Sequence, residues 1–150
     1  MSDIIWSLKP VEEGKYSIIN RVKNYSQELL AVQGINAIFD IDEELDNRIE
    51  NPQVRKNILL VTKEAMNNIA KYSKANTASI SLRQVNQSVN LIITDDGIGF
   101  DQTVATAGNG LHNMLQRSKQ IKGACNIISS VGKGTTVKCI YPIAIISHTI

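Results

Sequence analysis

Apolar residues recur along this chain at two spacings, one typical of helices and one typical of strands. Ile18, Val22, Tyr25 and Leu29 follow one another at intervals of 4, 3 and 4 residues. This spacing places them on one face of an amphipathic helix, which Gly34 is expected to end.

A second helix has a clear start signal at Asn51, which can cap it, and at Pro52, which suits its first turn. The helix is expected to run to about Ser73. Its core stripe consists of Val54, Ile58, Val61, Ala65 and Ile69.

Strands are predicted where apolar and polar residues alternate. Residues 77–84 and 88–95 alternate in this way and predict a hairpin. The other expected elements are a short strand at about 35–40, a loop of small residues at 101–109, a helix at about 110–121 and strands near 124–131 and 135–141. This order predicts an α+β fold, a two-layer α/β sandwich whose mixed, mostly antiparallel sheet carries its helices on one face.

The composition is that of an ordinary soluble domain. The chain has 150 residues, 43% hydrophobic and 20% charged, and a formal charge of +2, which gives no reason to expect nucleic acid as a partner. No apolar run reaches the roughly 20 residues that span a bilayer, and no signal peptide is evident. We expect a cytoplasmic domain, whose full-length parent could be anchored in the cell membrane.

Three segments are expected along the chain. Residues 1–10 are interpreted as the end of an upstream dimerisation helix or linker, because DIIWSL is stopped by Pro10 and is too short to pack alone. Residues 11–142 form the main domain. Residues 143–150 form an apolar tail, for which packing on the sheet edge and disorder both stay open.

The two cysteines, Cys125 and Cys139, lie in neighbouring predicted strands. A disulfide is geometrically conceivable, but two buried thiols in a reducing cytosol are expected. Neither cysteine belongs to a pair with metal-ligand spacing.

The second helix carries a first group of candidate residues, Glu64, Asn68, Lys71 and Tyr72, which share one side at helical spacing. An amide oxygen can bind Mg²⁺, an ammonium can neutralise phosphate, and a carboxylate can hold a water or accept a proton. A solvated helix face is the alternative, and it is the commoner explanation of such residues taken alone.

A second candidate site is the sequence DDGIG at residues 95–99, where a predicted strand ends. Asp95 shares the parity of the inward apolar residues, so it should point to the core side while Asp96 points away. A carboxylate there needs a donor, which the exocyclic amine of a heterocycle such as adenine would supply. Gly97 and Gly99 would let the backbone approach a ligand. A plain Asp-Gly turn explains the same residues.

Two further glycine-rich segments are weaker signals. Gly108, Gly110 and Leu111 open a predicted helix, where backbone N–H groups and the helix N-terminus favour phosphate; a flexible connector is the alternative. Arg117 could face the same way. Residues 132–136 alone indicate only a hairpin turn.

In this order, the segments resemble the ATP-binding boxes of histidine kinases. The matching stretches are EAMNNIAKY (64–72) for the N box, residues 95–99 for the first glycine box, GNGLHNM (108–114) with Arg117 for the second, and GTTV (134–137) for the closing strand. The resemblance covers about 35–142 and is specific in order and spacing. It is a resemblance to the superfamily shared by histidine kinases, DNA gyrase, the heat-shock chaperone and mismatch-repair ATPases. The nearest likeness is to sensor kinases that pair with DNA-binding response regulators, whose catalytic domains often follow a Leu-x-Pro that Leu8-Lys9-Pro10 resembles.

The resemblance implies a site for ATP and Mg²⁺ under a lid at about 100–109. By motif position, the resemblance implies that Asn68 binds Mg²⁺, that Lys71 contacts phosphate and that Glu64 orients or activates the attacking group. It implies that Tyr72, where many relatives have histidine, covers the ligand. Around the base, the resemblance implies that Asp95 receives the adenine amine, that Gly97 and Gly99 shape the wall beside it, and that Thr135 lies near adenine. It also implies that Gly108 and Gly110, beside Leu111, contact the phosphates.

The implied function is transfer of the ATP γ-phosphoryl to a histidine on a dimerisation helix absent from this chain. His112 and His148 lack the acidic helical context of an acceptor, so the fragment is expected to bind ATP as a monomer without phosphorylating itself. Expected partners are the parent's own dimerisation helices and a response regulator. A stand-alone anti-sigma-factor-type serine kinase and a nucleotide-sensing interaction module are the alternatives.

Overall fold

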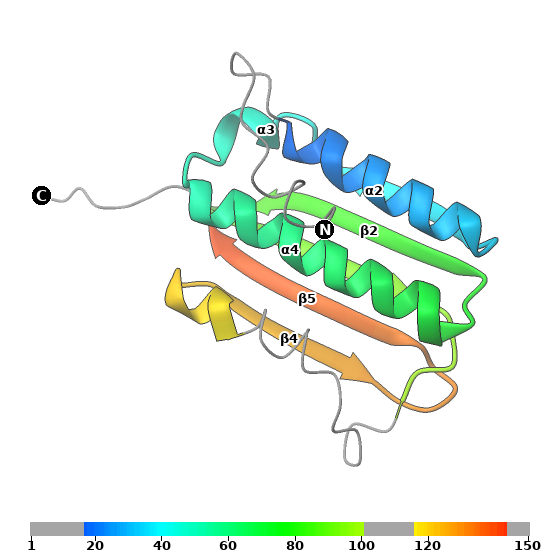
Figure 1. The fold of residues 1–150 in the computed structure, drawn as a ribbon. Helices are drawn as coiled ribbons and strands as arrows, with labels where there is room; N and C mark the ends of the chain where they lie inside the picture. The colour runs from blue at the N-terminus through cyan, green and yellow to red at the C-terminus, as the bar shows by residue number, and fades with distance from the viewer. Residues whose placement is uncertain (1–16, 101–115, 144–150) are drawn as a thin grey trace, which may run out of the picture.

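The computed structural model describes residues 17–100 and 116–143 as one sheet with helices on a single face (Figure 1). The elements are α2 (Ile18–Val32), β1 (Asn36–Ile41), α3 (Leu45–Arg48), α4 (Pro52–Asn68), the π-helical turn η1 (Ile69–Ser73), β2 (Thr77–Val85), β3 (Ser88–Asp95), β4 (Ala124–Ser129) and β5 (Thr135–Pro142). Residues 116–120 are also helical. The predicted two-layer α+β sandwich is confirmed.

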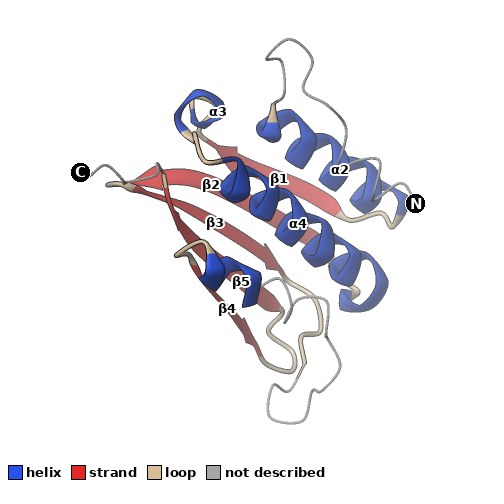
Figure 2. Cartoon of the chain, turned by 60° about the vertical axis from the view of Figure 1, so that its left-hand side comes forward, coloured by secondary structure: helices blue, strands red, loops and turns tan. Residues whose placement is uncertain are grey.

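The sheet has five strands in the order β1-β2-β3-β5-β4. Among the strands of the described residues, β1 and β2 pair in parallel and the other pairs are antiparallel. Figure 2 shows α2 and α4 lying side by side over the sheet. The residues that fill the space between the layers are fully or almost fully buried, among them Val22, Leu30, Ile58, Val61, Ile80, Leu82, Leu91 and Ile93.

The predicted start of α4 is observed, and α2 begins with a cap of the same kind, which was not predicted. The Ser17 hydroxyl accepts a hydrogen bond from the Asn20 N–H at the start of α2 (3.1 Å), and the Asn51 side chain accepts one from the Gln53 N–H at the start of α4 (2.8 Å). Gly34, at φ +72°, follows the end of α2 as expected. These caps satisfy N–H groups that a helix cannot satisfy within itself.

The sequence did not predict α3, because a helix of 4 residues is too short to show a helical period. Its Asp46 nevertheless connects three helices. The Asp46 carboxylate accepts hydrogen bonds from the Ser17 hydroxyl (2.6 Å) and the Ile18 N–H (2.8 Å), and it pairs with Arg55 of α4 (3.3 Å).

The two cysteines form a disulfide, which corrects the expectation of two free thiols. Cys125 and Cys139 are direct register partners on β4 and β5, with Cα atoms 3.9 Å apart. Strand register decides whether two such cysteines can meet, because a slip of one residue turns a side chain to the opposite face. The spacing in the sequence did not determine that register.

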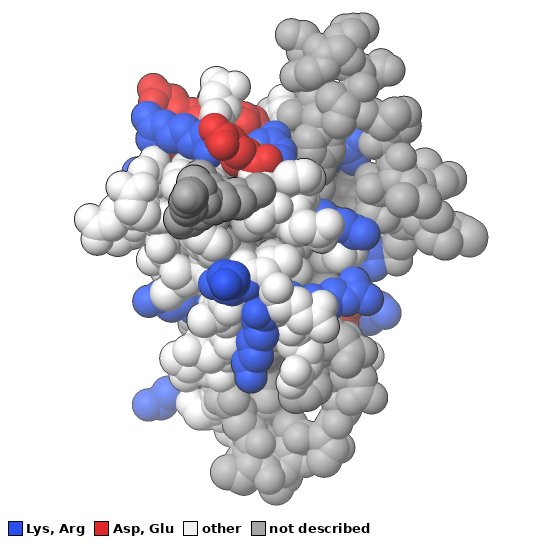
Figure 3. Space-filling view, turned by 90° about the vertical axis from the view of Figure 1, so that its left-hand side faces the viewer, with Lys and Arg blue, Asp and Glu red and all other residues white. Residues whose placement is uncertain are grey.

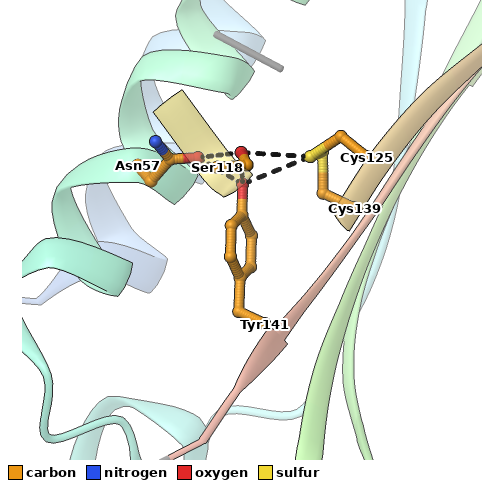
Figure 4. The surroundings of a disulfide bond; sticks show 5 residues. All are labelled: Asn57, Ser118, Cys125, Cys139 and Tyr141. Atoms are coloured by element: carbon orange, nitrogen blue, oxygen red, sulfur yellow. Dashed lines mark hydrogen bonds between the residues drawn. A yellow bond between two sulfur atoms is a disulfide. The ribbon is translucent and has the colours of Figure 1, made fainter. Parts of the chain in front are cut away.

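A buried polar cluster lies beside this disulfide (Figure 4). The Oδ1 atom of Asn57, on α4, accepts hydrogen bonds from the Ser118 hydroxyl (2.7 Å) and the Tyr141 hydroxyl (2.6 Å). Burial raises the pKa of Tyr141 to about 12. The cluster therefore ties the helical segment at 116–120 to both α4 and β5.

Charges on the surface are mixed in sign. On the face shown in Figure 3, acidic side chains gather at one corner beside basic ones, and other Lys and Arg side chains are scattered. Exposed ion pairs include Lys23 with Glu43 (2.8 Å) and Arg83 with Asp40, and such pairs add little stability. None of the helices in the described ranges has both the length and the apolar character needed to cross a membrane.

Candidate nucleotide-binding site

Asp95 is the buried charge of the site. Asp95 is the last residue of β3 and is only 4% exposed. Its side chain points to the core side, as the alternation along the strand predicts. Its carboxylate accepts hydrogen bonds from the backbone N–H groups of Gly97 (2.8 Å) and Thr135. The pKa of Asp95 is raised, mainly because the carboxyl group is buried. The two N–H groups of Gly97 and Thr135 lower this pKa and the charge of Asp96 raises it, but burial has the largest effect.

Asp96 turns the opposite way, as expected. It is exposed, and its carboxylate accepts hydrogen bonds from the backbone N–H groups of Asn76 (2.8 Å) and Thr77 (3.0 Å). The bonds from Thr77 and Asn76 hold the pKa of Asp96 below its usual value. Two adjacent carboxylates thus have opposite environments, and only Asp95 faces the interior.

The loop after β3 is locked against the end of the long helix. The Ile98 N–H donates to the Ser73 carbonyl (2.8 Å), and a Cβ atom on Gly97 would lie 2.1 Å from that same carbonyl oxygen. No side chain fits there, so Gly97 permits the contact between the two predicted boxes. The N-box helix and Asp95 are therefore held in one fixed arrangement.

The long helix does not continue as an α-helix to Ser73, which corrects the sequence expectation. It is α-helical to Asn68 and then forms the π-helical turn η1 over Ile69–Ser73. The Ser73 hydroxyl donates to the Ile69 carbonyl (2.8 Å), and Lys74 in the left-handed region (φ 55°) ends the turn. At the end of this turn, the Ser73 carbonyl accepts the hydrogen bond from the loop after β3. Single π-turns are often found at functional sites.

The N-box side chains are consequently divided between two helix types. Glu64 and Asn68 lie one α-helical turn apart and are partly buried, whereas Lys71 and Tyr72 lie in η1 and are exposed. Glu64, Asn68 and Lys71 make no side-chain hydrogen bond or ion pair within the described residues. The four side chains are thus near one another along the helix, but Lys71 and Tyr72 do not follow the α-helical spacing that was expected.

The hairpin between β4 and β5 packs against Asp95 and the loop after β3, on the side opposite the N-box helix. Thr135 is the register partner of Asp95, and the Gly132 N–H donates to the Ile98 carbonyl (2.7 Å). Gly134 has φ +74°, and a Cβ atom there would lie 2.0 Å from the Asp95 carbonyl oxygen. Gly99, at φ +64°, is similarly close to the carbonyls of this hairpin.

Part of the predicted site lies outside the described residues. This holds for Gly108, Gly110 and Leu111, for both histidines, and for the expected lid beyond Phe100. Arg117 is described and is exposed.

Two further polar residues were missed by sequence reasoning. Ser73 and Ser129 are both buried and hydrogen bonded at the junctions of the site. Only the alternating parity of β4 distinguishes Ser129 from its exposed neighbour Ser130, and a serine carries no apolar signal.

Comparison with known families places these features in context. The family model described as "Histidine kinase-, DNA gyrase B-, and HSP90-like ATPase" matches residues 53–145, which include α4, Asp95 and the final hairpin. The chain belongs to this family. The resemblance found in the sequence is confirmed.

Two relatives that the chain matches are described as sensor or sensor-like histidine kinases. The chain is 29% identical over 145 residues to "Sensor histidine kinase LiaS" from Bacillus subtilis and 27% identical over 147 residues to an "Uncharacterized sensor-like histidine kinase" from Chloroflexus aurantiacus. The matches take in 95% and 93% of this chain but only 39% and 25% of those proteins. The chain therefore spans well under half of the relatives that it matches.

Solved structures share the fold at lower identity. The histidine kinase domain of the blue-light activated histidine kinase EL346 from Erythrobacter litoralis has a TM-score of 0.71 at 12% identity, covering 89% of this chain and 64% of that one. The catalytic domain of histidine kinase ThkA has a TM-score of 0.68 at 18% identity, covering 85% and 91%. The ATPase fold of this chain is thus also that of histidine kinase catalytic domains.

Replacing Asp95 is expected to change how stability depends on pH. Because the pKa of Asp95 is raised in the folded chain, its contribution to stability is full below the unfolded pKa, near 3.8, and is lost as the pH rises through the folded pKa. Asp95→Asn removes this loss. The free energy of unfolding of the variant, minus that of the wild type, should therefore increase from pH 4 to 7 in denaturant titrations. A difference that is constant or falls over this range would contradict the assignment of a buried, destabilised carboxylate.

Proposed function

We propose that this chain is the ATP-binding catalytic domain of a sensor histidine kinase. In this proposal it transfers the γ-phosphoryl group of ATP to a histidine on a dimerisation helix outside this chain. The observation that carries the proposal is the buried Asp95 carboxylate, held beside the end of the N-box helix by the contact between Ile98 and Ser73. The descriptions of the two sequence relatives support it.

Adenine recognition would use the acceptor character of Asp95. The exocyclic amine of adenine is a donor, and an ionised carboxylate only accepts hydrogen bonds. The Gly97 and Thr135 N–H groups occupy only part of the acceptor capacity of the carboxylate, which has about four lone-pair sites. A base amine would satisfy a further site and offset part of the cost of burying the charge.

The donor set on α4 fits Mg²⁺. The ion prefers oxygen ligands in octahedral geometry, keeps several waters and takes others from substrate phosphates, so one or two protein oxygens suffice. The amide oxygen of Asn68, which is partly buried at the end of α4, would supply one. When bound, the ion would neutralise charge on the phosphates.

The remaining N-box groups would handle the reacting groups. Lys71 is exposed in η1, where its ammonium would contact the phosphates, and Tyr72 would cover the ligand. Glu64 would orient the acceptor imidazole and take its proton as the N–P bond forms and the bond to the β–γ bridging oxygen breaks, which releases ADP. Catalysis in such a site rests mainly on positioning and charge stabilisation.

The proposed partners follow from this reaction. They are the parent's dimerisation and phosphoacceptor helices, and a response regulator that takes the phosphoryl group from the histidine. The isolated chain is proposed to be a monomer. It is proposed to lie in the cytoplasm, in a parent protein that either is anchored in the membrane or is cytoplasmic as a whole.

Nucleotide binding with Mg²⁺ tests the site directly. Asp95→Asn should weaken ATP binding by about 1–3 kcal/mol, the usual cost of leaving a buried hydrogen-bonding group without its partner. Asn68→Ala should instead reduce the dependence of affinity on Mg²⁺. Asp96→Asn is the matched control, because Asp96 is exposed and faces away; isothermal titration should find its affinity unchanged. Equal affinities for ATP and GTP in the wild type would contradict the assignment of Asp95.

Phosphotransfer requires an acceptor helix, so it is tested in a chimera. This chain would replace the matching part of the Bacillus subtilis kinase LiaS, and the chimera would be incubated with radiolabelled ATP and Mg²⁺. We expect acid-labile phosphohistidine in the chimera, none in its Asn68→Ala form, and none in the chain alone. Acid-stable label on serine would instead support the serine kinase alternative, and stable label on His112 would contradict the need for a separate helix.

A further inference from the structure

Three polar residues form a row across the sheet at the edge of the site. Asp95 on β3, Thr135 on β5 and Ser129 on β4 are successive register partners. The next row inward is apolar and consists of Ile93, Val137 and Ile127. The polar row therefore lies where the core ends, and Ser129 is its buried outer member, 8% exposed.

The hydroxyl proton of Ser129 has a defined direction. A serine hydroxyl donates one hydrogen bond and can accept two. Ser129 donates to the Gly134 carbonyl (3.1 Å), which can only accept, and it accepts from the Phe100 N–H (2.9 Å), which can only donate. Because the described bond to Gly134 uses the one proton of Ser129, we assign Thr135 as the donor in the contact between the two hydroxyls, whose oxygens are 2.8 Å apart.

This assignment determines what Thr135 can offer to a ligand. Once its proton is committed to Ser129, the Thr135 oxygen can only accept hydrogen bonds. The neighbouring Asp95 carboxylate is likewise an acceptor, and it takes the Thr135 N–H. This end of the sheet thus presents two adjacent acceptors, which suit the amine at position 6 of adenine and oppose the carbonyl oxygen at the same position of guanine.

Ser129 also fixes the loop that carries the adenine wall. The Phe100 N–H that it accepts lies directly after Gly99, and the Gly132 N–H binds the Ile98 carbonyl in the same loop (2.7 Å). One hydroxyl therefore connects the hairpin, the loop after β3 and the hydroxyl of Thr135.

We propose that Ser129 is a positioning residue for base specificity, which orients the Thr135 hydroxyl as an acceptor and so favours ATP over GTP. The proposal rests on the proposed ATP-binding function. It adds a residue outside the boxes and a reason for the choice of base.

The test is the ratio of ATP to GTP affinity in the full chain with Mg²⁺. Ser129→Ala should lower ATP affinity by about five- to tenfold, the factor expected for one hydrogen bond, and should reduce the ratio by a similar factor. Ser129→Thr keeps the hydroxyl and should restore the ratio. Ser130→Ala, at the exposed neighbouring serine, is the matched control and should bind as the wild type does. An unfolded fraction lowers both affinities alike, so the ratio reports on base recognition separately from stability.

The variants distinguish a role of Ser129 in base recognition from a purely structural role. If Ser129→Ala lowers the melting temperature but keeps the wild-type ratio, Ser129 is only structural and the inference fails. If Ser129→Ala does not fold, Thr135→Ser and Thr135→Val decide, because only serine keeps the hydroxyl that Ser129 contacts; equal ratios in those two variants overturn the inference. A wild-type chain that binds neither nucleotide refutes the proposed function itself, which is a distinct result.

Discussion

The carboxylate of Asp95 is buried at the end of β3 with no cationic partner among the described residues, and the site is built around that charge. Two backbone N–H groups, those of Gly97 and Thr135, stabilise it. Burial still dominates, as the raised pKa shows. A group of this kind weakens the free fold, and such residues are characteristic of binding and catalytic sites.

Close backbone contacts, together with the Ser129 hydroxyl, hold the surrounding segments around this charge. The Ser73 carbonyl lies against Gly97, and the Asp95 carbonyl lies against Gly134, at distances that leave no space for a Cβ atom. These contacts join the N-box helix, the loop after β3 and the final hairpin. Gly97 and Gly134, two glycines of the family motifs, therefore have a structural role in this chain that does not depend on a bound nucleotide.

Most of the fold could be predicted from the sequence, because each main helix or strand buries one face and its apolar residues therefore recur at a regular spacing. The start of α4, the hairpin of β2 and β3, and the inward direction of Asp95 all followed from spacing or from a cap. The turn η1 could not be predicted in this way, because a single π-turn is rare and is too short to show a period of its own. The disulfide depends on strand register, and Ser129 on a hydrogen-bond network, which periodicity does not report. The roles given to Glu64, Asn68 and Lys71 stay predictions from the motif.

The most direct measurement of the central claim is a crystal structure of the chain with a non-hydrolysable ATP analogue and Mg²⁺. We predict that the adenine amine lies within hydrogen-bonding distance of the Asp95 carboxylate, at about 3 Å. A nucleotide bound elsewhere, or a base that makes no contact with Asp95, would contradict the account.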